Sequence, residues 1–427
     1  MKLKNTLFGS EVKRSDVSKY NACVGNNGWV GMHSYIDGFQ SSTVILLESL
    51  IKDVDKEDFD GFMWCLDTCV YPILFSARHF LELFLKQQIL RISYLKNKNK
   101  NKNESDYEIK LKLLKTHDTH KLWKLFLAEV KEVSDSRLNE YLNKIHIFTL
   151  EFHNIDSTGE TFRYPYNQTN SLHLTKHSVI GLKRFYQQFL KFSKLASEFS
   201  YLTDYLLLEY RVGTYTKNLS RNDIEQIAFS LPKKDNWKSQ NLKKHQLDAK
   251  NKYGIGCREF KEVLEIIKKN IEFNNIVSNE YTLNINEEKL IKFCLNCLME
   301  SKQDLNLSLS DLAVIRAIQE ISVPIIDGKY FSEDIHYLTE HYYKEYENSS
   351  EYALENKIEY IYENLNRTIN GLKKLRQTNT LNKIHIAFKN LFVCLLKNHK
   401  DDPLDIESRP RSARHQFEAM FKDIIFN

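Results

Sequence analysis

Hydrophobic residues recur at three- and four-residue steps along most of this chain, which is the spacing of one face of an α-helix. Between Leu182 and Leu206 the phenylalanines follow this spacing, and the pattern indicates a helix whose rings pack into a core. A second strong pattern, over Tyr71–Tyr94, predicts a helix with Pro72 in its first turn. Further helices are predicted over about residues 104–116, 119–133, 136–153, 258–273, 285–302, 308–322, 331–347, 351–376, 380–398 and 411–426. The predicted fold class is all-α.

The helical pattern breaks in two places. Residues 154–171 hold turn-forming residues and predict a loop with a hairpin near Thr158–Tyr166, where Asp156 and Arg163 would form a local salt bridge. Residues 213–252 hold Pro232 and a lysine cluster, and predict a boundary. We therefore expect two helical bundles: residues 1–215, with an irregular N-terminal segment, and residues 258–427, joined by a basic linker at 216–257.

The composition agrees with a helical protein of the cytoplasm. Glycine occurs 13 times and proline 6 times in 427 residues, well below their average shares of roughly 7% and 5%. At least about 60% helix is expected. No apolar run reaches the roughly 18–20 residues of a membrane helix, and the N-terminal residues lack the apolar segment of a secretory signal. The seven scattered cysteines indicate reduced thiols, which is typical of a cytoplasmic protein.

A Ser-Ala-Arg-His motif occurs twice. Residues 76–89 read SARHFLELFLKQQI and residues 412–425 read SARHQFEAMFKDII, with identical residues at seven of the fourteen aligned positions. An old duplication, a convergent site and coincidence all remain open as explanations.

The first copy has two interpretations. On a helix, Arg78, His79, Glu82 and Lys86 fall on one narrow strip, and apolar residues cover the rest of the surface. The strip can be a salt-bridge ladder, because Arg78–Glu82 and Glu82–Lys86 are i,i+4 pairs. It can also line a cleft in which Arg78 binds a phosphate, His79 titrates and Glu82 assists.

The second copy carries a denser basic cluster. Arg409, Arg411 and Arg414 precede His415, and Ser412 is a candidate N-cap that follows Pro410. Basic groups at a helix N-terminus make a favourable anion site. A basic C-terminal tail is the alternative.

Positive charge is concentrated in one further segment. Between Lys233 and Lys252 seven lysines stand against two aspartates, an excess of five that equals the net charge of +5 of the whole chain. This predicts an RNA-binding surface that includes Lys233, Lys234, Lys243 and Lys244, near Trp237 and Tyr253. A solvated linker is the alternative.

The N-terminal half resembles bacterial proteins of the HEPN type, an all-helical superfamily of nucleotide-binding domains. The matching elements are the YPILFSARHFLELFLKQQI helix, the segment His117–Trp123 (HDTHKLW) and the segment Asp156–Pro165 (DSTGETFRYP). The resemblance covers about residues 60–210. HEPN ribonucleases are marked by an arginine, four to six residues and a histidine, and this chain has that spacing at Arg409–His415, outside the resembling region.

The resemblance implies metal-independent RNA cleavage in a toxin or in antiphage defence. In such a reaction a histidine moves the proton of the attacking 2′-hydroxyl, while an arginine holds the phosphate. Two such motifs usually face each other across a dimer, so the resemblance also implies a homodimer or a partner protein of a defence system.

We therefore expect a HEPN-type endoribonuclease whose catalytic residues are Arg78, His79, Glu82, Arg409, Arg414 and His415. The RNA-contacting residues are expected to be Arg163 and the four lysines named above. Motifs for nucleotide cofactors and complete sets of metal ligands are missing from the sequence, so neither a cofactor nor a metal is predicted. The rival hypothesis is a non-catalytic helical sensor or interaction protein on the same scaffold.

Overall fold

Most of the described part of the chain is helical. The computed structural model describes Lys19, residues 21–25, 31–56, 64–96, 115–133, 135–167, 169–237, 240–278, 281–299, 306–323 and 330–398, with Ala419 and Phe421. Of these residues 76% are helical and none belongs to a strand, which confirms the predicted all-α class. In place of the expected hairpin there is one isolated bridge, between Tyr166 and Leu172. Within these ranges no helix combines the length and the apolar character needed to cross a bilayer.

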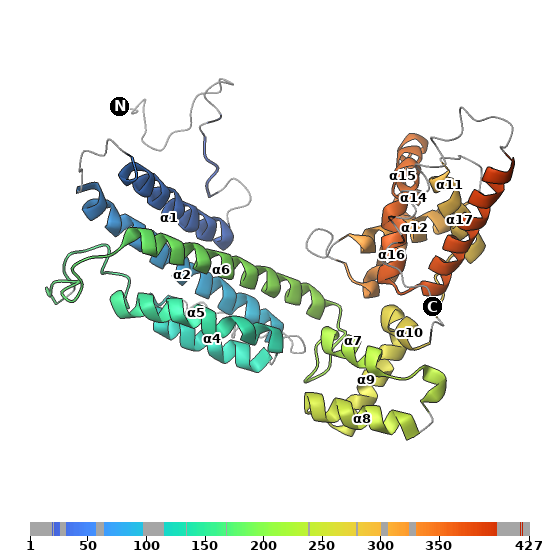
Figure 1. The fold of residues 1–427 in the computed structure, drawn as a ribbon, viewed down its shortest axis with the longest axis horizontal. Helices are drawn as coiled ribbons and strands as arrows, with labels where there is room; N and C mark the ends of the chain where they lie inside the picture. Colours follow the sequence, from blue (N-terminus) through green and yellow to red (C-terminus); the bar gives the residue numbers. More distant parts are fainter. Residues whose placement is uncertain are drawn as a thin grey trace. The chain divides into compact units, whose positions relative to one another are not determined.

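The chain divides into two compact units, residues 1–203 and 204–427. The first unit is a helical bundle (Figure 1). Its described helices are α1 (Met32–Val54), α2 (Trp64–Lys96), α4 (Thr119–Val133), α5 (Ser136–Ile155) and α6 (Leu182–Arg211), whose last residues belong to the second unit. Helices α4 and α5 match the predicted ranges closely. A further helix was predicted over about residues 104–116, and residues 104–114 of it lie outside the described residues.

Helix α2 begins earlier than its sequence pattern suggests. It includes Trp64, so Pro72 lies inside the helix and not in its first turn. Proline removes one backbone N–H donor from a helix. Because Pro72 lies on the exposed side of α2, water can hydrate the backbone there, and the helix continues through it.

The core of the first unit is a seam of aromatic rings between α2 and α6. Phe80 lies 5.7 Å from Phe189 and 5.5 Å from Phe192, between ring centres. Phe84 lies 6.1 Å from Phe192 and 6.2 Å from Phe199. All five rings are at most 3% exposed, and edge-to-face contacts of this kind stabilise beyond the area they bury. The prediction that the phenylalanines of α6 form core is confirmed.

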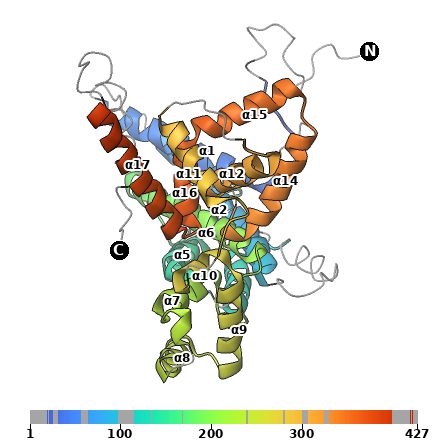
Figure 2. The ribbon, with the colours of Figure 1, turned by 90° about the vertical axis from the view of Figure 1, so that its right-hand side faces the viewer.

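The second unit contains two hydrophobic cores. The first core is built by α7 (Arg221–Ser230), α8 (Gln240–Tyr253), α9 (Cys257–Lys269) and α10 (Ile271–Val277), with a short 3₁₀ helix at Lys234–Asn236. The second core is built by α11 (Glu287–Leu298), α12 (Leu309–Ser322), α14 (Ile335–Glu347), α15 (Glu351–Glu363), α16 (Leu365–Lys374) and α17 (Thr378–Asn398), with a 3₁₀ helix at Ser332–Asp334 (Figure 2).

The stretch that we expected to be a basic linker, residues 216–257, is largely helical. It holds α7 and α8, and it contributes buried Ile224, Ile227 and Ala249 to the first core of this unit. The sequence did not indicate this role, because α8 is rich in lysine and few of its residues, such as Ala249, are buried in the core.

A buried arginine connects the elements of the two cores. Arg221 donates to Glu272 at 2.7 Å and to Glu333 at 2.8 Å, and its guanidinium carbon lies 4.8 Å and 5.0 Å from the ring centres of Phe273 and Phe331. Burial alone would lower the pKa of Arg221, but the charges of Glu272 and Glu333 raise it above its ordinary value. The arginine therefore stays charged inside the unit, where it links α7 to α10 and to the 3₁₀ helix at Ser332–Asp334.

Helices α12 and α16 meet at a glycine. A Cβ atom added to Gly371 would lie 2.0 Å from the carbonyl oxygen of Ile318 and 2.6 Å from its Cγ2 atom. Gln319, which is fully buried, donates from its amide nitrogen to the carbonyl of Ile361 at 2.8 Å and to the hydroxyl of Thr368 at 3.0 Å. The two helix backbones can approach this closely only because residue 371 has no side chain.

We expect Gly371→Ala to lower the free energy of unfolding by about 1–3 kcal/mol or more, because the new methyl group meets the backbone of α12. Gly38→Ala is the matched control: Gly38 also lies inside a helix, but nothing is within 4 Å of its added Cβ. That substitution should stabilise by about 0.5–1 kcal/mol through the unfolded state. Thermal melting followed by circular dichroism measures both. Gly371→Ala melting at or above the wild-type temperature would contradict the packing.

Candidate functional site

The guanidinium of Arg78 is the centre of a buried polar network in the first unit. Arg78 donates to a Glu82 carboxylate oxygen at 2.6 Å, to the carbonyl of Asp156 at 3.2 Å and to the carbonyl of His117. Its side chain is 2% exposed. The Arg78 network, by which we mean Arg78, Glu82, Lys86, His117 and Asp156, joins α2 to the segment before α4 and to the loop after α5.

Glu82 accepts from three donors. Its carboxylate lies 2.6 Å from Arg78, 2.7 Å from the Lys86 Nζ atom and 2.9 Å from the His117 Nδ1 atom. Burial alone would raise the pKa of Glu82, but the hydrogen bonds and charges of Lys86 and Arg78 hold it below its ordinary value. The i,i+4 ladder predicted on this helix is confirmed, and it is buried.

The loop after α5 is built around Arg78. One carboxylate oxygen of Asp156 accepts from the backbone N–H groups of Gly159, at 2.7 Å, and Thr161, at 3.2 Å. Gly159 has φ +83°, and a Cβ there would lie 3.1 Å from the guanidinium carbon of Arg78. A side chain would therefore be strained and crowded at this position.

Arg163 fixes the same turn from outside. Its Nε atom donates to the carbonyl of Gly159 at 2.6 Å, and its guanidinium lies 5.9 Å from the Phe75 ring centre and 5.5 Å from that of Tyr164. The other oxygen of Asp156 lies 3.5 Å from Arg78. The local salt bridge expected between Asp156 and Arg163 is thus replaced by contacts of each residue with Arg78 or with the backbone. Arg163 remains exposed.

His79 is separate from the ladder although it follows Arg78 directly. Its ring stacks on Phe75 at 5.6 Å with an interplanar angle of 10°, and Phe39 of α1 meets it edge-on at 4.4 Å. Burial lowers the pKa of His79, and Glu82 only partly opposes this. Adjacent residues on a helix point about 100° apart, so Arg78 and His79 serve different contacts: one holds the loops, and the other packs α1 against α2.

His117, the first residue of the HDTHKLW segment, belongs to the Arg78 network. His117 donates from Nδ1 to the buried Glu82 carboxylate, yet its side chain is 59% exposed. A carboxylate that orients one imidazole nitrogen and leaves the other for a ligand is the arrangement used in acid–base catalysis. The sequence did not show the pairing of His117 with Glu82, because the two residues are 35 positions apart.

Further histidines gather at the start of α4. Asp118 caps this helix by accepting from the backbone N–H groups of His120 at 3.0 Å and Lys121 at 3.1 Å. His120 stacks on His153 of α5 at 4.9 Å between ring centres, and burial lowers the pKa of His120. Among the described residues, no group of three or more potential ligands is arranged to hold a metal ion.

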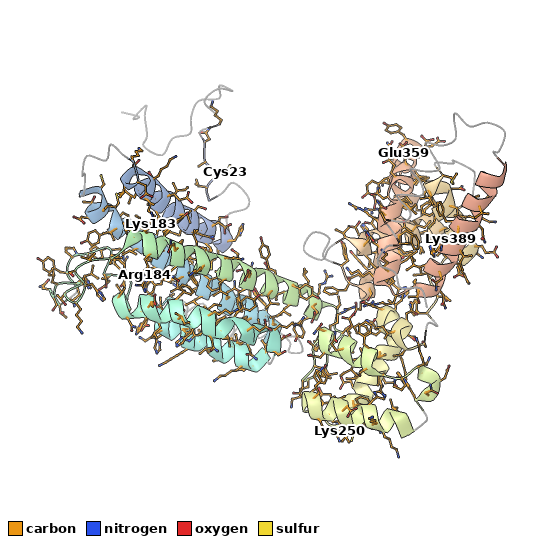
Figure 3. The ribbon with its side chains drawn as sticks, viewed as in Figure 1. Cys23, Lys183, Arg184, Lys250, Glu359 and Lys389 are labelled. Carbon is orange, nitrogen blue, oxygen red and sulfur yellow. The ribbon has the colours of Figure 1, made fainter. Side chains whose placement is uncertain are left out.

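The predicted RNA-contacting lysines lie in the second unit. Lys243 and Lys244 are exposed on α8, and Lys233 is exposed while its Nζ atom donates to the carbonyl of Ile276 at 3.1 Å. Lys234 is half-buried. Lys250, which Figure 3 labels, lies on α8 together with Lys243 and Lys244.

The two aromatic residues near these lysines have structural contacts. Trp237 donates from its indole nitrogen to the carbonyl of Pro232 at 2.9 Å, and both Trp237 and Tyr253 pack against the first core of the second unit. The ammonium of Lys252 lies 4.9 Å from the Tyr253 ring centre. Lys243 and Lys244 are thus exposed on α8, whereas both rings are partly used in packing.

The second Ser-Ala-Arg-His motif falls outside the part of the chain that the structure describes. Arg409, Arg414 and His415 lie outside the described residues, as do most residues of the helix predicted over 411–426. Phe421 is described: it is buried and stacks on His385 at 5.4 Å.

We expect Arg78→Ala to destabilise the first unit by about 3–5 kcal/mol, because Glu82 keeps its charge in the interior while losing its closest partner. Arg184→Ala is the control: Arg184 is an exposed arginine of α6, labelled in Figure 3, and its loss should change the stability by less than about 0.5 kcal/mol. Chemical denaturation of both variants measures the difference. Equal midpoints for Arg78→Ala and wild type would show that the ladder is not a stabilising element.

Comparison with known protein families, with characterised proteins and with solved structures finds no match to this chain.

Proposed function

We propose that this chain is a metal-independent endoribonuclease of HEPN type that acts in phage defence or as a toxin, with His117 as an acid–base residue. One observation carries the proposal: an imidazole that is 59% exposed is held at 2.9 Å by the buried carboxylate of Glu82. Arg78 and Lys86 fix that carboxylate in turn. Because the carboxylate holds the imidazole of His117 in place, little conformational entropy is lost when the imidazole contacts a substrate hydroxyl.

The chemistry requires two proton transfers. The 2′-hydroxyl of the RNA attacks the neighbouring phosphorus and gives up its proton, while the departing 5′-oxygen takes one. In the proposal His117 serves one of these transfers, and His120 or His153, which stack on each other at 4.9 Å, serves the other. Lys121 and Lys124 are exposed in the first turns of α4, where they can neutralise the phosphate.

The role of Arg78 changes in this proposal. Its three acceptors belong to the protein and its side chain is 2% exposed, so we assign to it the positioning of Glu82 and His117 and not the binding of phosphate. Arg163 is exposed next to the same turn and takes the place of the phosphate-binding arginine. Arg409, Arg414 and His415 keep their proposed catalytic role within a homodimer or with a partner protein.

A second candidate is a non-catalytic sensor or interaction protein on the same scaffold. The burial of both Arg78 and Glu82, at 2% and 1% exposure, favours it, because such a ladder serves stability without any catalytic role. The two candidates differ in whether the wild-type chain produces new RNA ends.

We expect His117→Ala to lower RNA cleavage by about 100-fold or more, which is typical of losing a general acid or base, without a large change in melting temperature. The assay counts new RNA ends in cells that express each variant. His177→Ala, which removes an exposed histidine from the loop before α6, should cleave like wild type, and His415→Ala tests the motif outside the described residues. RNA binding by the wild-type chain without any new RNA ends would favour the non-catalytic candidate. Cleavage by His117→Ala that equals cleavage by wild type would refute the assignment of His117 as an acid–base residue.

The lysines of α8 make a separate prediction. Changing Lys243 and Lys244 to Glu should weaken RNA binding and reduce its dependence on salt, because phosphate contacts release counterions. The matched control changes two exposed lysines of α6, Lys191 and Lys194, to Glu, so that the net charge falls by the same amount. Titrations of a labelled single-stranded RNA at several salt concentrations measure both. If both double variants bind alike, α8 is merely a solvated face.

A further inference from the structure

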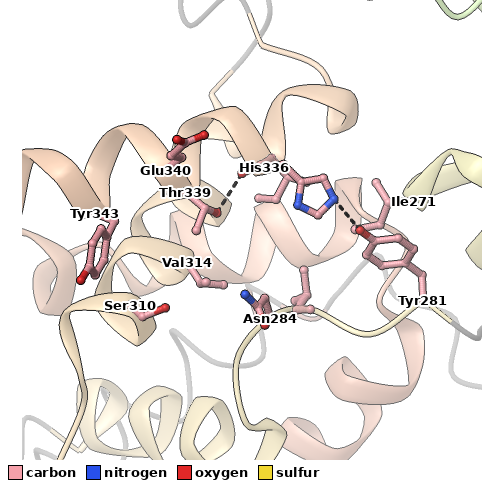
Figure 4. A pocket seen from close by; sticks show the side chains of 11 residues that line it. Ile271, Tyr281, Asn284, Ser310, Val314, His336, Thr339, Glu340 and Tyr343 are labelled. Carbon is pink, nitrogen blue, oxygen red and sulfur yellow. Dashed lines mark hydrogen bonds between the residues drawn. The ribbon is translucent and has the colours of Figure 1, made fainter.

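The second unit carries a depression of about 260 Å³ between the segment after α10, the start of α12 and one face of α14. Its floor is apolar and buried, formed by Ile271, Val314 and Ile335. Figure 4 shows Tyr281 and Tyr343 at opposite ends, with Val314 between them. We call this depression the α12–α14 pocket.

One wall of the pocket is held rigidly. The backbone N–H of Tyr281 donates to Asn275 at 3.2 Å, and its carbonyl accepts from Gln377 at 3.0 Å. Both of these partners are buried. The phenol oxygen of Tyr281 lies 2.6 Å from the Nε2 atom of His336 (Figure 4), and burial raises the pKa of Tyr281, so the phenol keeps its proton. Both the backbone and the phenol of Tyr281 are therefore hydrogen-bonded within the unit.

The rim carries hydrogen-bonding groups of both kinds. Asn284 offers an amide and Ser310 a hydroxyl, and both are exposed. Glu340 adds a carboxylate that pairs at 2.9 Å with Lys344, outside the lining. Neither lysine nor arginine is among the residues that line the pocket, so a phosphate or another anion would meet no cation there.

A small volume, an apolar floor and aromatic ends suit one flat ring. The volume lies below the roughly 300–1,000 Å³ of pockets for drug-sized ligands, which excludes a large ligand. Aromatic side chains stack on planar heterocycles, and Asn284 with Ser310 can pair with a ring edge that bears both donors and acceptors. A charged or long flexible ligand would leave these groups unmatched.

We infer that the α12–α14 pocket binds a nucleobase, presented either by a free nucleoside or by an unpaired position of a nucleic-acid strand. This site lies wholly in the second unit, and it goes beyond the proposed ribonuclease, whose acid–base residues lie in the first. The base lies over Val314 between Tyr281 and Tyr343, with its edge toward Asn284 and Ser310.

The test is calorimetric titration of the full chain with adenosine, guanosine, cytidine and uridine, and separately with a short unstructured RNA oligonucleotide. Tyr343→Ala removes a stacking partner of the base, and His336→Ala removes the hydrogen bond that holds the Tyr281 phenol. Each should weaken binding of the preferred nucleoside by about tenfold or more. Tyr352→Ala removes a tyrosine that is 75% exposed on α15 and outside the lining, and it should bind like wild type. Melting curves confirm that the variants are folded.

Each result decides the inference. Nucleoside binding that the two pocket variants lose supports it and identifies a free ligand; oligonucleotide binding alone, with the same loss, supports it and identifies a strand. Binding that all three variants retain, or no binding of any probe at millimolar concentration, would overturn it. These results are independent of RNA cleavage, because His117→Ala should bind the nucleoside normally.

Discussion

The N-terminal unit depends on one buried arginine whose guanidinium is shared by three segments of the chain. Arg78 lies on the central helix, but two of its acceptors are backbone carbonyls, at His117 and Asp156. An unpaired charge in the interior is costly, so the segments before α4 and after α5 must remain where they satisfy it. The position of His117 over Glu82 follows from this constraint.

The second unit uses the same physical solution with other residues. Arg221 is sandwiched between two phenylalanine rings and donates to two carboxylates. Since Glu272 and Glu333 are themselves mostly buried, the three charges are favourable only together. In both units, then, a buried arginine fixes elements that the hydrophobic core alone would leave free to slide, because apolar contacts have no direction.

The groups available to a ligand lie at the edges of these rigid assemblies. His117 reaches solvent from the end of the Arg78 network, and Tyr281 is held by buried amides at one wall of the α12–α14 pocket. An exposed group on an immobile support has little conformational entropy to lose on binding. This shared property makes both sites candidates, although they differ in chemistry: an imidazole beside a buried carboxylate at the first, and two tyrosine rings with hydrogen-bonding side chains at the second.

Much of the local structure was determined by the sequence by itself. The apolar spacing placed α4, α5, α6 and most helices of the second unit, and the i,i+4 pairs of the ladder follow from helix geometry alone. Asp118 was recognisable as a helix cap. These features depend on residues within one or two turns of each other.

The local sequence pattern did not predict the positions at which two long helices divide. The helix predicted over 351–376 ends at Asn364 and restarts as α16, and the one predicted over 258–273 divides at Asn270. The amide of Asn364 bonds to the carbonyl of Tyr360, and the side chain of Asn270 caps α10. An asparagine can sit within a helix or cap its end, and packing on both sides decides which.

The candidate site itself was decided only by the tertiary structure. Arg78 meets Asp156 across 78 residues and Glu82 meets His117 across 35, and periodicity carries no information on such distant pairs. The sequence grouped Arg78 with His79. In the structure Arg78 contacts the two loops, whereas His79 packs against the rings of Phe39 and Phe75. Burial is a property of the folded chain, so only the tertiary structure could separate an arginine that holds loops from one that awaits a ligand.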